Sequence, residues 1–136
     1  VREGRHVGAL AYRESSLVAW VSVGPLVDSH WTLPRVAVLG DSARSTAGIV
    51  CFAVAPTERG RGVQREALQA LVPYGRAQGW TAIEGYPFDQ SAIDKHGADV
   101  RWPGLTAAFA GAGFSRVGAH WLNRPEAERS IFEIVL

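Results

Sequence analysis

The sequence predicts an α/β domain in which a mixed β-sheet is flanked by helices. An apolar run at residues 49–55 ends at Pro56, passes a turn rich in glycine and arginine, and resumes at helical spacing as far as Leu71. A further strand-like run follows this helix, and strands joined by a crossover helix usually pair in parallel. Two apolar runs near the start predict an antiparallel hairpin instead. Parallel and antiparallel pairs in one chain indicate a mixed sheet.

The hairpin is predicted from residues 6–12 and 17–23, which are apolar, rich in β-branched side chains and separated by four polar residues. Gly24 and Pro25 end its second strand. Residues 26–48 have weak periodicity and many turn residues, so we expect a long irregular connection with at most one short helical turn. Connections of that length in compact domains are usually functional or mobile.

The central strand is predicted at residues 48–55, because an apolar run without alternation is typical of a strand covered on both faces. Apolar residues recur at helical spacing from Val63 onward. Pro73 predicts a kink in this helix, and Gly79 predicts its end. Residues 81–88 are predicted to form the next strand, parallel to the central one.

The last third of the chain begins with residues 89–101, which are polar and irregular and form a second candidate loop for substrate contact. A short helix is predicted over residues 105–112 and a strand over residues 115–121. A closing strand follows at residues 130–136. The polar residues 123–129 join these two strands, and the charge cluster at 124–129 is typical of a solvated turn.

Length and composition describe a single globular domain over residues 1–136, with 47% hydrophobic and 20% charged residues. A net charge of +1 gives no general attraction to nucleic acid or to an anionic membrane, so we expect neither partner. Cys51 is the single cysteine, which excludes a disulfide framework and fits a cytoplasmic protein. No apolar stretch approaches the roughly 20 residues of a membrane span. Because the chain begins at Val1 without methionine, we expect an N-terminal portion to precede it.

The turn after the central strand has the chemistry of an anion-binding site. The first four amides of a helix lack intrahelical acceptors and carry the positive end of its dipole. Gly60 and Gly62 let the backbone approach a ligand oxygen, and Arg59 and Arg61 add positive charge. This combination predicts a phosphate ligand. The third glycine of a dinucleotide fingerprint and the Gly-Lys-Ser/Thr of a P-loop are both absent. A solvated basic turn is the alternative interpretation.

The segment Arg59-x-x-Gly62-x-Gln64 resembles the coenzyme A pyrophosphate loop of the GCN5-related N-acetyltransferases. That family's pattern is Gln/Arg-x-x-Gly-x-Gly/Ala, so Gln64 departs from it at the last position. Residues 105–118 resemble the family's fourth helix and its Gly-Phe exit into the next strand. The resemblance covers nearly the whole chain, from the family's second strand onward, while its first strand and first two helices have no counterpart. Further segments resemble a bacterial subgroup of the family, namely Leu33-Pro34-Arg35, Cys51-Phe52 and Glu84-Gly85-Tyr86-Pro87.

The resemblance implies an acyl-CoA-dependent N-acyltransferase that moves an acetyl group directly to a primary amine of a small-molecule or peptide acceptor. Acetyl-CoA would be the co-substrate, and no metal is implied. Members of this family often pair through their later strands, so a homodimer is one of the oligomeric states that the resemblance leaves open. The implied cofactor-binding residues are the backbone of Phe52, Ala53 and Val54, the turn residues Arg59, Gly60, Arg61, Gly62, Val63 and Gln64, and Phe109.

Two catalytic residues are proposed with the resemblance. Glu84 is the candidate base because it lies on the strand beside the cofactor strand and shares a face with Tyr86. A glutamate in a salt bridge, or loss of the amine proton to water, are the open alternatives. The family often has a tyrosine acid four residues before the glycine of the Gly-Phe exit, and Phe109 stands there. A phenyl ring cannot donate a proton, so Tyr86 is the candidate acid, or the thiolate leaves unassisted.

Because of Phe109 and Gln64, a non-catalytic CoA-binding or regulatory module is the alternative function. A small nucleic-acid or anion-binding domain is a third hypothesis, disfavoured by the small net charge.

Among the remaining polar and aromatic residues, few are candidates for the site. Cys51 lies inside a predicted buried strand and is interpreted as a small hydrophobe. The four histidines have no metal-ligand spacing, but the loops of His30 and His96 flank the expected acceptor site. Trp31 and Trp102 stand beside the irregular segments and are candidates for substrate contact.

Overall fold

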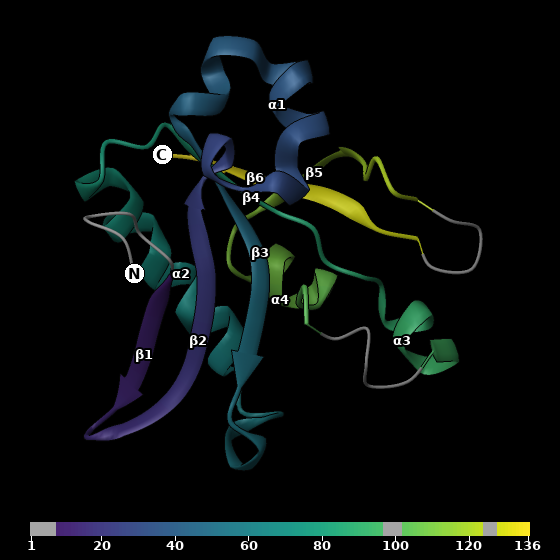
Figure 1. Cartoon of the computed structure of the whole chain (residues 1–136). Coiled ribbons are helices and arrows are strands. Elements are labelled where there is room, and N and C mark those ends of the chain that lie inside the picture. Colours follow the sequence, from purple (N-terminus) through teal and green to yellow (C-terminus); the bar gives the residue numbers. More distant parts are fainter. Residues whose placement is uncertain (1–7, 97–101, 124–127) are drawn as a thin grey trace.

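The computed structural model describes residues 8–96, 102–123 and 128–136. Within these residues the chain forms one six-stranded sheet with the strand order β1-β2-β3-β4-β6-β5 (Figure 1). The β3–β4 pair is parallel and all the other pairs are antiparallel. The predicted fold class, a mixed sheet flanked by helices, is confirmed. The strands are β1 (Ala9–Arg13), β2 (Ser16–Pro25), β3 (Thr46–Val54), β4 (Ala82–Gly85), β5 (Ser115–Ala119) and β6 (Ser130–Val135).

The described helices are α1 (Leu33–Leu39), α2 (Val63–Ala77), α3 (Gln90–His96) and α4 (Thr106–Gly111). Short 3-10 turns lie at Leu26–Asp28, His30–Thr32, Gly40–Arg44 and Pro56–Glu58. None of the described helices is both long enough and apolar enough to cross a membrane.

The main core lies between the sheet and the two helices α2 and α4. The predicted apolar stripe of α2 is buried at Val63, Ala67, Leu68 and Leu71. These side chains belong to one cluster with residues of β2, β3 and β4 and with Phe109 of α4. β3 is buried from Thr46 to Ile49, as its continuous apolar sequence predicts, but of residues 50–54 only Phe52 is buried.

Two segments predicted to be irregular contain helices. Residues 26–48 include α1 and three 3-10 turns, and Pro34, which counts as a turn signal, stands in the first turn of α1. Proline is tolerated there because its missing N–H would have no helical acceptor. Residues 90–96 form α3, whose start is supported by the bond from the Ala92 N–H to the Asp89 carbonyl (3.0 Å). The rest of that predicted loop, residues 97–101, lies outside the described residues.

The strands β3 and β4 separate after a short parallel ladder. Pairing covers Thr46 to Ile49 of β3 and ends at Gly85 of β4, although β3 continues to Val54. Pro87 has no N–H to continue the β4 ladder. Phe88 instead forms a parallel bridge with Leu105.

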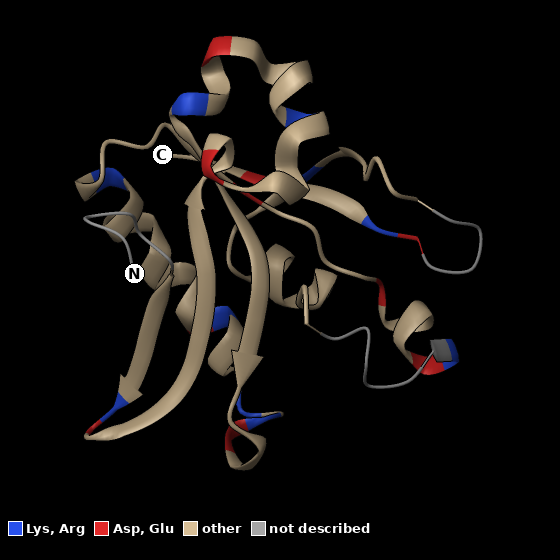
Figure 2. Cartoon of the chain, in the orientation of Figure 1, with Lys and Arg blue, Asp and Glu red and all other residues tan. Residues whose placement is uncertain are grey.

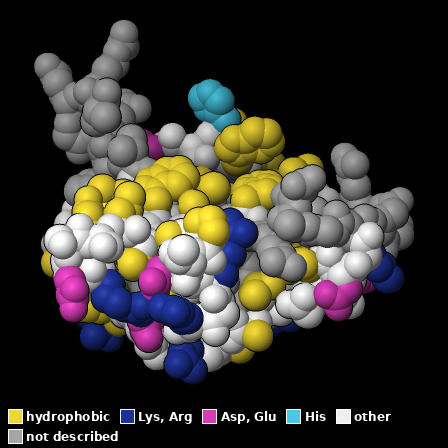
Figure 3. Space-filling model, turned by 90° about the horizontal axis from the view of Figure 1, so that it is seen from below, with side chains coloured by type: hydrophobic (Ala, Val, Ile, Leu, Met, Phe, Trp, Pro, Cys, Tyr) yellow, Lys and Arg dark blue, Asp and Glu magenta, His cyan; other side chains and the backbone are white. Residues whose placement is uncertain are grey.

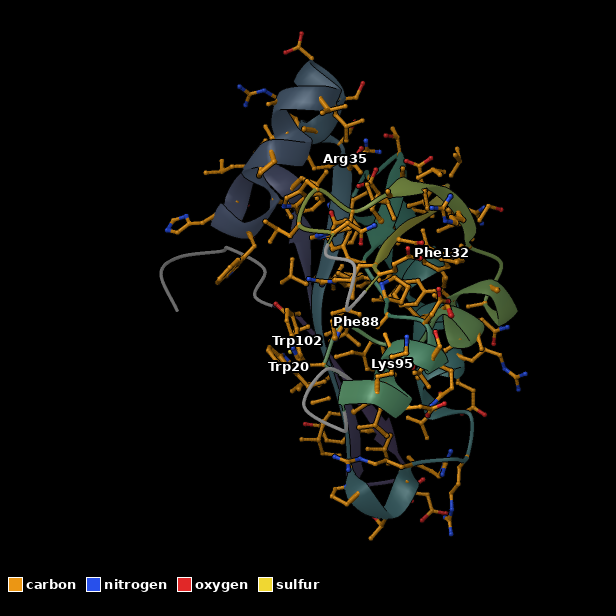
Figure 4. The ribbon with its side chains drawn as sticks, turned by 90° about the vertical axis from the view of Figure 1, so that its right-hand side faces the viewer. Trp20, Arg35, Phe88, Lys95, Trp102 and Phe132 are labelled. Carbon is orange, nitrogen blue, oxygen red and sulfur yellow. The ribbon has the colours of Figure 1, made fainter. Side chains whose placement is uncertain are left out.

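The segment 102–105 therefore lies between the diverging chains. On one side the Phe88 N–H donates to the Gly104 carbonyl (3.2 Å), and on the other the Phe52 N–H donates to the Trp102 carbonyl (2.6 Å). Phe88 and Trp102 are neighbours in Figure 4.

Gly85 is the position where a side chain would disturb this arrangement most directly. A Cβ there would overlap the ring of Phe109, which is fully buried. We expect Gly85→Ala to lower the free energy of unfolding by about 2 kcal/mol, because overpacking a dense core forces neighbouring groups to move. Urea denaturation measures this change.

Gly118→Ala in β5 is the matched control, since no heavy atom lies within 4 Å of an added Cβ. Its effect should stay within about 0.5 kcal/mol. Equal stabilities of the two variants would contradict the packing of Phe109 against β4.

Candidate active site

The turn between β3 and α2 lies at the lower end of the sheet in Figure 1. Gly60 and Gly62 have φ values of 75° and 79°, in the left-handed region that favours glycine. Within the described part of the chain, the amides of residues 60–65 donate no hydrogen bond to another protein group. The Arg59 amide contacts the Pro56 carbonyl at 3.4 Å. A row of unpaired amides thus begins at Gly60, one residue later than the sequence suggests.

The charges around this turn are mixed. Arg13 forms ion pairs with Glu58 and with Glu66 (3.5 Å), and Arg61 approaches Glu58 at 3.5 Å. Arg65 forms no ion pair with a described carboxylate. Basic and acidic residues gather at the same end of the ribbon in Figure 2, and the view from below shows them side by side (Figure 3). The turn is therefore only weakly positive, and its unpaired amides are the feature that distinguishes it from an ordinary charged turn.

The backbone of residues 52–54 differs in part from the expectation. The Ala55 N–H donates to the Val18 carbonyl of β2 (2.9 Å), whereas the Phe52 N–H points the opposite way, to Trp102. Consecutive residues of a strand direct their backbone N–H and C=O groups to alternate sides. The backbone groups of Ala53 therefore face β2, whereas those of Phe52 and Val54 face the gap where β3 and β4 separate, which is called the opening below. This corrects the expectation that all three offer free groups. The Phe52 amide has an internal acceptor, and the Val54 carbonyl accepts a bond from Arg59 Nε (3.3 Å).

Gln64 connects the turn to the segment before α4. Its Oε1 accepts the Leu105 N–H at 3.3 Å, and its amide lies close to Gly104, whose φ is 97°. Phe109 is fully buried and packs edge-to-face on Phe114. Phe109 is thus part of the core, and its contact with a cofactor stays a prediction.

Glu84 lies in the ion pair that the sequence leaves open as an alternative. Its carboxylate is fully buried, and Arg35 Nε lies 3.0 Å from both of its oxygens. The hydrogen bond to Glu84 raises the pKa of Arg35, against the opposing effect of burial. Both oxygens are engaged, so Glu84 reaches an acceptor amine only if this pair opens. The geometry supports the salt bridge over the role of base.

Tyr86 is buried, and its hydroxyl lies 3.4 Å from the Glu84 carboxylate, to which it donates. Burial, followed by the negative charge of Glu84, raises the pKa of Tyr86 above its ordinary value. Tyr86 therefore stays protonated, but it gives up that proton less readily than an unperturbed tyrosine.

A cavity of about 260 Å³ adjoins Tyr86. Cys51 lines it and is half-buried, which corrects the expectation of a fully buried small hydrophobe. Trp31 also lines a neighbouring groove of about 450 Å³, together with His30, while the side chain of His96 lies outside the described part. The cavity is lined by Trp31, Thr32, Val50, Cys51, Tyr86, Trp102, His120, Trp121, Leu122 and Arg129.

His120 is a site residue that the sequence does not single out, because a lone histidine at a strand end has no distinguishing signal. Its Nδ1 accepts the Leu122 N–H (3.0 Å), so the ring hydrogen is assigned to Nε2. The ring stacks on Trp121 with centroids 3.8 Å apart. Burial, and then the charge of Arg129, lower the pKa of His120 to about 4. The imidazole is neutral at pH 7 and has no free nitrogen to accept an amine proton.

Arg129 is the second site residue that the sequence does not reveal, because its position there is interpreted as part of a solvated turn. Its Nε donates to the Tyr86 carbonyl (3.3 Å), and its guanidinium lies over the rings of Phe88 (4.7 Å) and Trp102 (5.3 Å). Burial lowers the pKa of Arg129 to about 10, so it remains positive at pH 7. No described carboxylate forms an ion pair with it.

A model of the acetyltransferase (GNAT) family matches residues 1–94, more than half of the chain. The chain belongs to this family. No curated protein matches it.

Solved acetyltransferase structures share the GNAT fold with this chain. Aminoglycoside acetyltransferase AAC(6')-Ib, solved with coenzyme A and kanamycin, has a TM-score of 0.61 at 15% identity over 96% of this chain and 68% of its own. Ribosomal-protein-alanine N-acetyltransferase from Brucella melitensis has a TM-score of 0.57 at 18% identity over 93% and 67%. Ard1 from Thermoplasma volcanium has a TM-score of 0.60 at 12% identity over 96% and 70%. The chain spans about two thirds of the length of these proteins.

In this GNAT chain, β3 connects the separate parts of the candidate site. Val50 and Cys51 line the cavity, Phe52 and Val54 face the opening, and the unpaired amides follow the end of the strand. At about 3.3 Å per residue, the cavity and the end of β3 are roughly 10 Å apart. Among the described residues, no group of His, Cys, Asp or Glu side chains could hold a metal ion.

The Arg35–Glu84 pair predicts a large loss of stability when one partner is removed. Glu84→Gln and Arg35→Met are each expected to cost about 3 kcal/mol, because each leaves a buried, uncompensated partner. The double variant should cost clearly less than the sum, as measured in a urea double-mutant cycle. Glu66→Gln, at the exposed pair with Arg13, is the control and should change stability by less than about 1 kcal/mol. If Glu84→Gln kept full stability and lost all acyl transfer, the role of base would be favoured.

The low pKa of His120 predicts a pH dependence of stability. The unfolded chain takes up this proton near pH 6.5 and the folded chain only near pH 4, so stability falls as pH decreases through that window. His120→Phe keeps a ring at this position and should show a shallower loss between pH 6.5 and pH 4 in thermal unfolding. His30→Phe, at an exposed position, is the control. Identical pH profiles for wild type and His120→Phe would contradict a neutral buried imidazole.

Proposed function

We propose that this GNAT chain is an acetyl-CoA-dependent N-acyltransferase that transfers the acetyl group directly to a primary amine of a small molecule. The observation that carries the proposal is the row of unpaired amides at residues 60–65, which includes two left-handed glycines and comes after the end of β3. Membership of the acetyltransferase family supports it. Structures of the same fold with bound acetyl-CoA or coenzyme A support it further.

In this proposal the turn holds the diphosphate of the cofactor. The amides of Gly60, Gly62, Val63 and Gln64 donate to phosphate oxygens, and Arg59, Arg61 and Arg65 add positive charge. Bound acetyl-CoA supplies an activated thioester. The Phe52 amide faces the opening and would donate to a carbonyl of the cofactor in place of Trp102.

The two proton transfers, from the amine and to the leaving thiolate, are assigned from the hydrogen-bonding atoms that the cavity side chains leave unoccupied. Glu84 is held by Arg35, and His120 offers no lone pair, so the amine loses its proton to water that enters the cavity. Tyr86 keeps its hydrogen, lies in the cavity wall and is the proposed donor of a proton to the leaving thiolate, although its raised pKa makes it a weak acid.

A non-catalytic CoA-binding module is the second candidate function. It is favoured by the engagement of Glu84 with Arg35 and by the raised pKa of Tyr86, which leave no strong base or acid at the cavity. Thiol release from acetyl-CoA over a panel of amines separates the two functions. Binding without turnover supports the module.

The turn predicts a specific effect of side chains at Gly62. Acetyl-CoA at millimolar concentration should raise the melting temperature of the wild type, since a ligand that binds only the folded state stabilises it. Gly62→Val should reduce or remove this shift, because a branched side chain strains the left-handed backbone and covers the amides.

Gly79→Val is the matched control. Gly79 has nearly the same φ (77°) and open space around it, but it lies beyond the other end of α2. Both variants should melt earlier without ligand, and only Gly62→Val should lose the shift. The absence of any shift in the wild type would reject both the enzyme and the module.

A further inference from the structure

We propose that the cavity beside Tyr86 accepts a small amine that has an aromatic or other apolar body and a carboxylate, and that Arg129 binds this carboxylate. The inference rests on the proposed acyl transfer at the same site. It names the class of acceptor, which neither the family nor the structures of the same fold identify for this chain.

The apolar part of the inference comes from the cavity wall. Trp31, Trp102, Trp121 and Tyr86 reach the cavity from four different parts of the chain. Aromatic rings pack well against aromatic and aliphatic groups but provide few hydrogen-bonding partners for a polar ligand surface. The volume of about 260 Å³ is below the roughly 300–1,000 Å³ of pockets for drug-sized ligands, so the acceptor is small.

The charged part comes from Arg129. It is the single charged side chain among the described residues that line the cavity. The bond to the Tyr86 carbonyl uses Nε, and the contacts with Phe88 and Trp102 use the faces of their rings. Its two Nη nitrogens make no bond to a described carboxylate.

A partly buried cation without a counter-ion is unfavourable, and burial accordingly lowers the pKa of Arg129. A ligand carboxylate would supply the missing charge, and a guanidinium binds it with two parallel hydrogen bonds.

The same charge argues against polycationic acceptors. AAC(6')-Ib was solved with kanamycin, an aminoglycoside. In this chain no described carboxylate lines the cavity, and Glu84, behind Tyr86, is already neutralised by Arg35. A ligand with several ammonium groups would add positive charge beside Arg129 with no partner for it. The cavity therefore distinguishes apolar amines that carry a carboxylate from polycationic amines.

Binding can be tested without acetyl transfer, because three of the five tryptophans line the cavity and report on it by fluorescence. L-Phenylalanine, L-phenylalaninamide and kanamycin are titrated separately into the protein. The first two have the same body and differ in the carboxylate. We expect L-phenylalanine to bind at least tenfold more tightly than its amide, and kanamycin to cause no saturable change.

Arg129→Gln should remove this tenfold preference and leave the affinity for the amide unchanged. Arg129→Lys should restore part of it, because the charge returns without the two-pronged geometry. Arg116→Gln, on β5 with its guanidinium bonded to Ser130, is the control and should bind all three ligands like the wild type. Thermal melts establish that each variant is folded.

Two outcomes would overturn the inference. One is equal affinity for L-phenylalanine and its amide in the wild type. The other is an undiminished preference in folded Arg129→Gln. Acetyl-CoA binding is measured separately by the melting shift. A normal shift with no carboxylate preference rejects the acceptor class and leaves the proposed function intact, whereas a missing shift rejects the function itself.

Discussion

The separation of β3 and β4 after Ile49 and Gly85 is the constraint on which the rest of the site depends. Had the ladder continued, the lower half of β3 would be an ordinary inner strand with every backbone group paired. Pro87 prevents this because it has no N–H, and Phe109 occupies the space beside Gly85. Beyond Ile49, the edge of β3 toward β4 donates one backbone hydrogen bond to the segment 102–105, from the Phe52 N–H to the Trp102 carbonyl. The cavity, the opening and the turn follow one another along this edge.

The Arg35–Glu84 pair has a structural consequence beyond its own charges. It attaches α1 to the central strands, and α1 continues from the 3-10 turn that contains Trp31. A buried pair of this kind adds little net stability compared with apolar residues, but its geometry is demanding. Through α1, the pair connects Glu84 to the cavity wall that contains Trp31.

Sequence reasoning identified the fold class and the strand-turn-helix unit because both depend on neighbours in the chain. The glycines, the end of the strand and the start of the helix all lie within a few residues of one another. The contacts it missed join distant residues: Gln64 and Leu105 are 41 positions apart, Tyr86 and Arg129 are 43, and Arg35 and Glu84 are 49. No local pattern specifies such pairings, so the sequence predicts a solvated turn for Arg129 and does not distinguish His120 from an ordinary surface histidine. The helices α1 and α3 were missed for another reason, since proline and polar residues serve helix starts as well as turns.

Trp102 takes part in both halves of the site. Its carbonyl accepts the Phe52 N–H, and its ring lies against the Arg129 guanidinium in the cavity wall. A ligand group that accepts the Phe52 N–H in place of Trp102 would release the Trp102 carbonyl and allow Trp102 to shift. A molecule in the cavity would instead hold the indole of Trp102 in place. The acetyl donor and the acceptor amine would then change each other's binding affinity by the same factor, as thermodynamic linkage requires. A single tryptophan can in this way couple the binding of the two substrates.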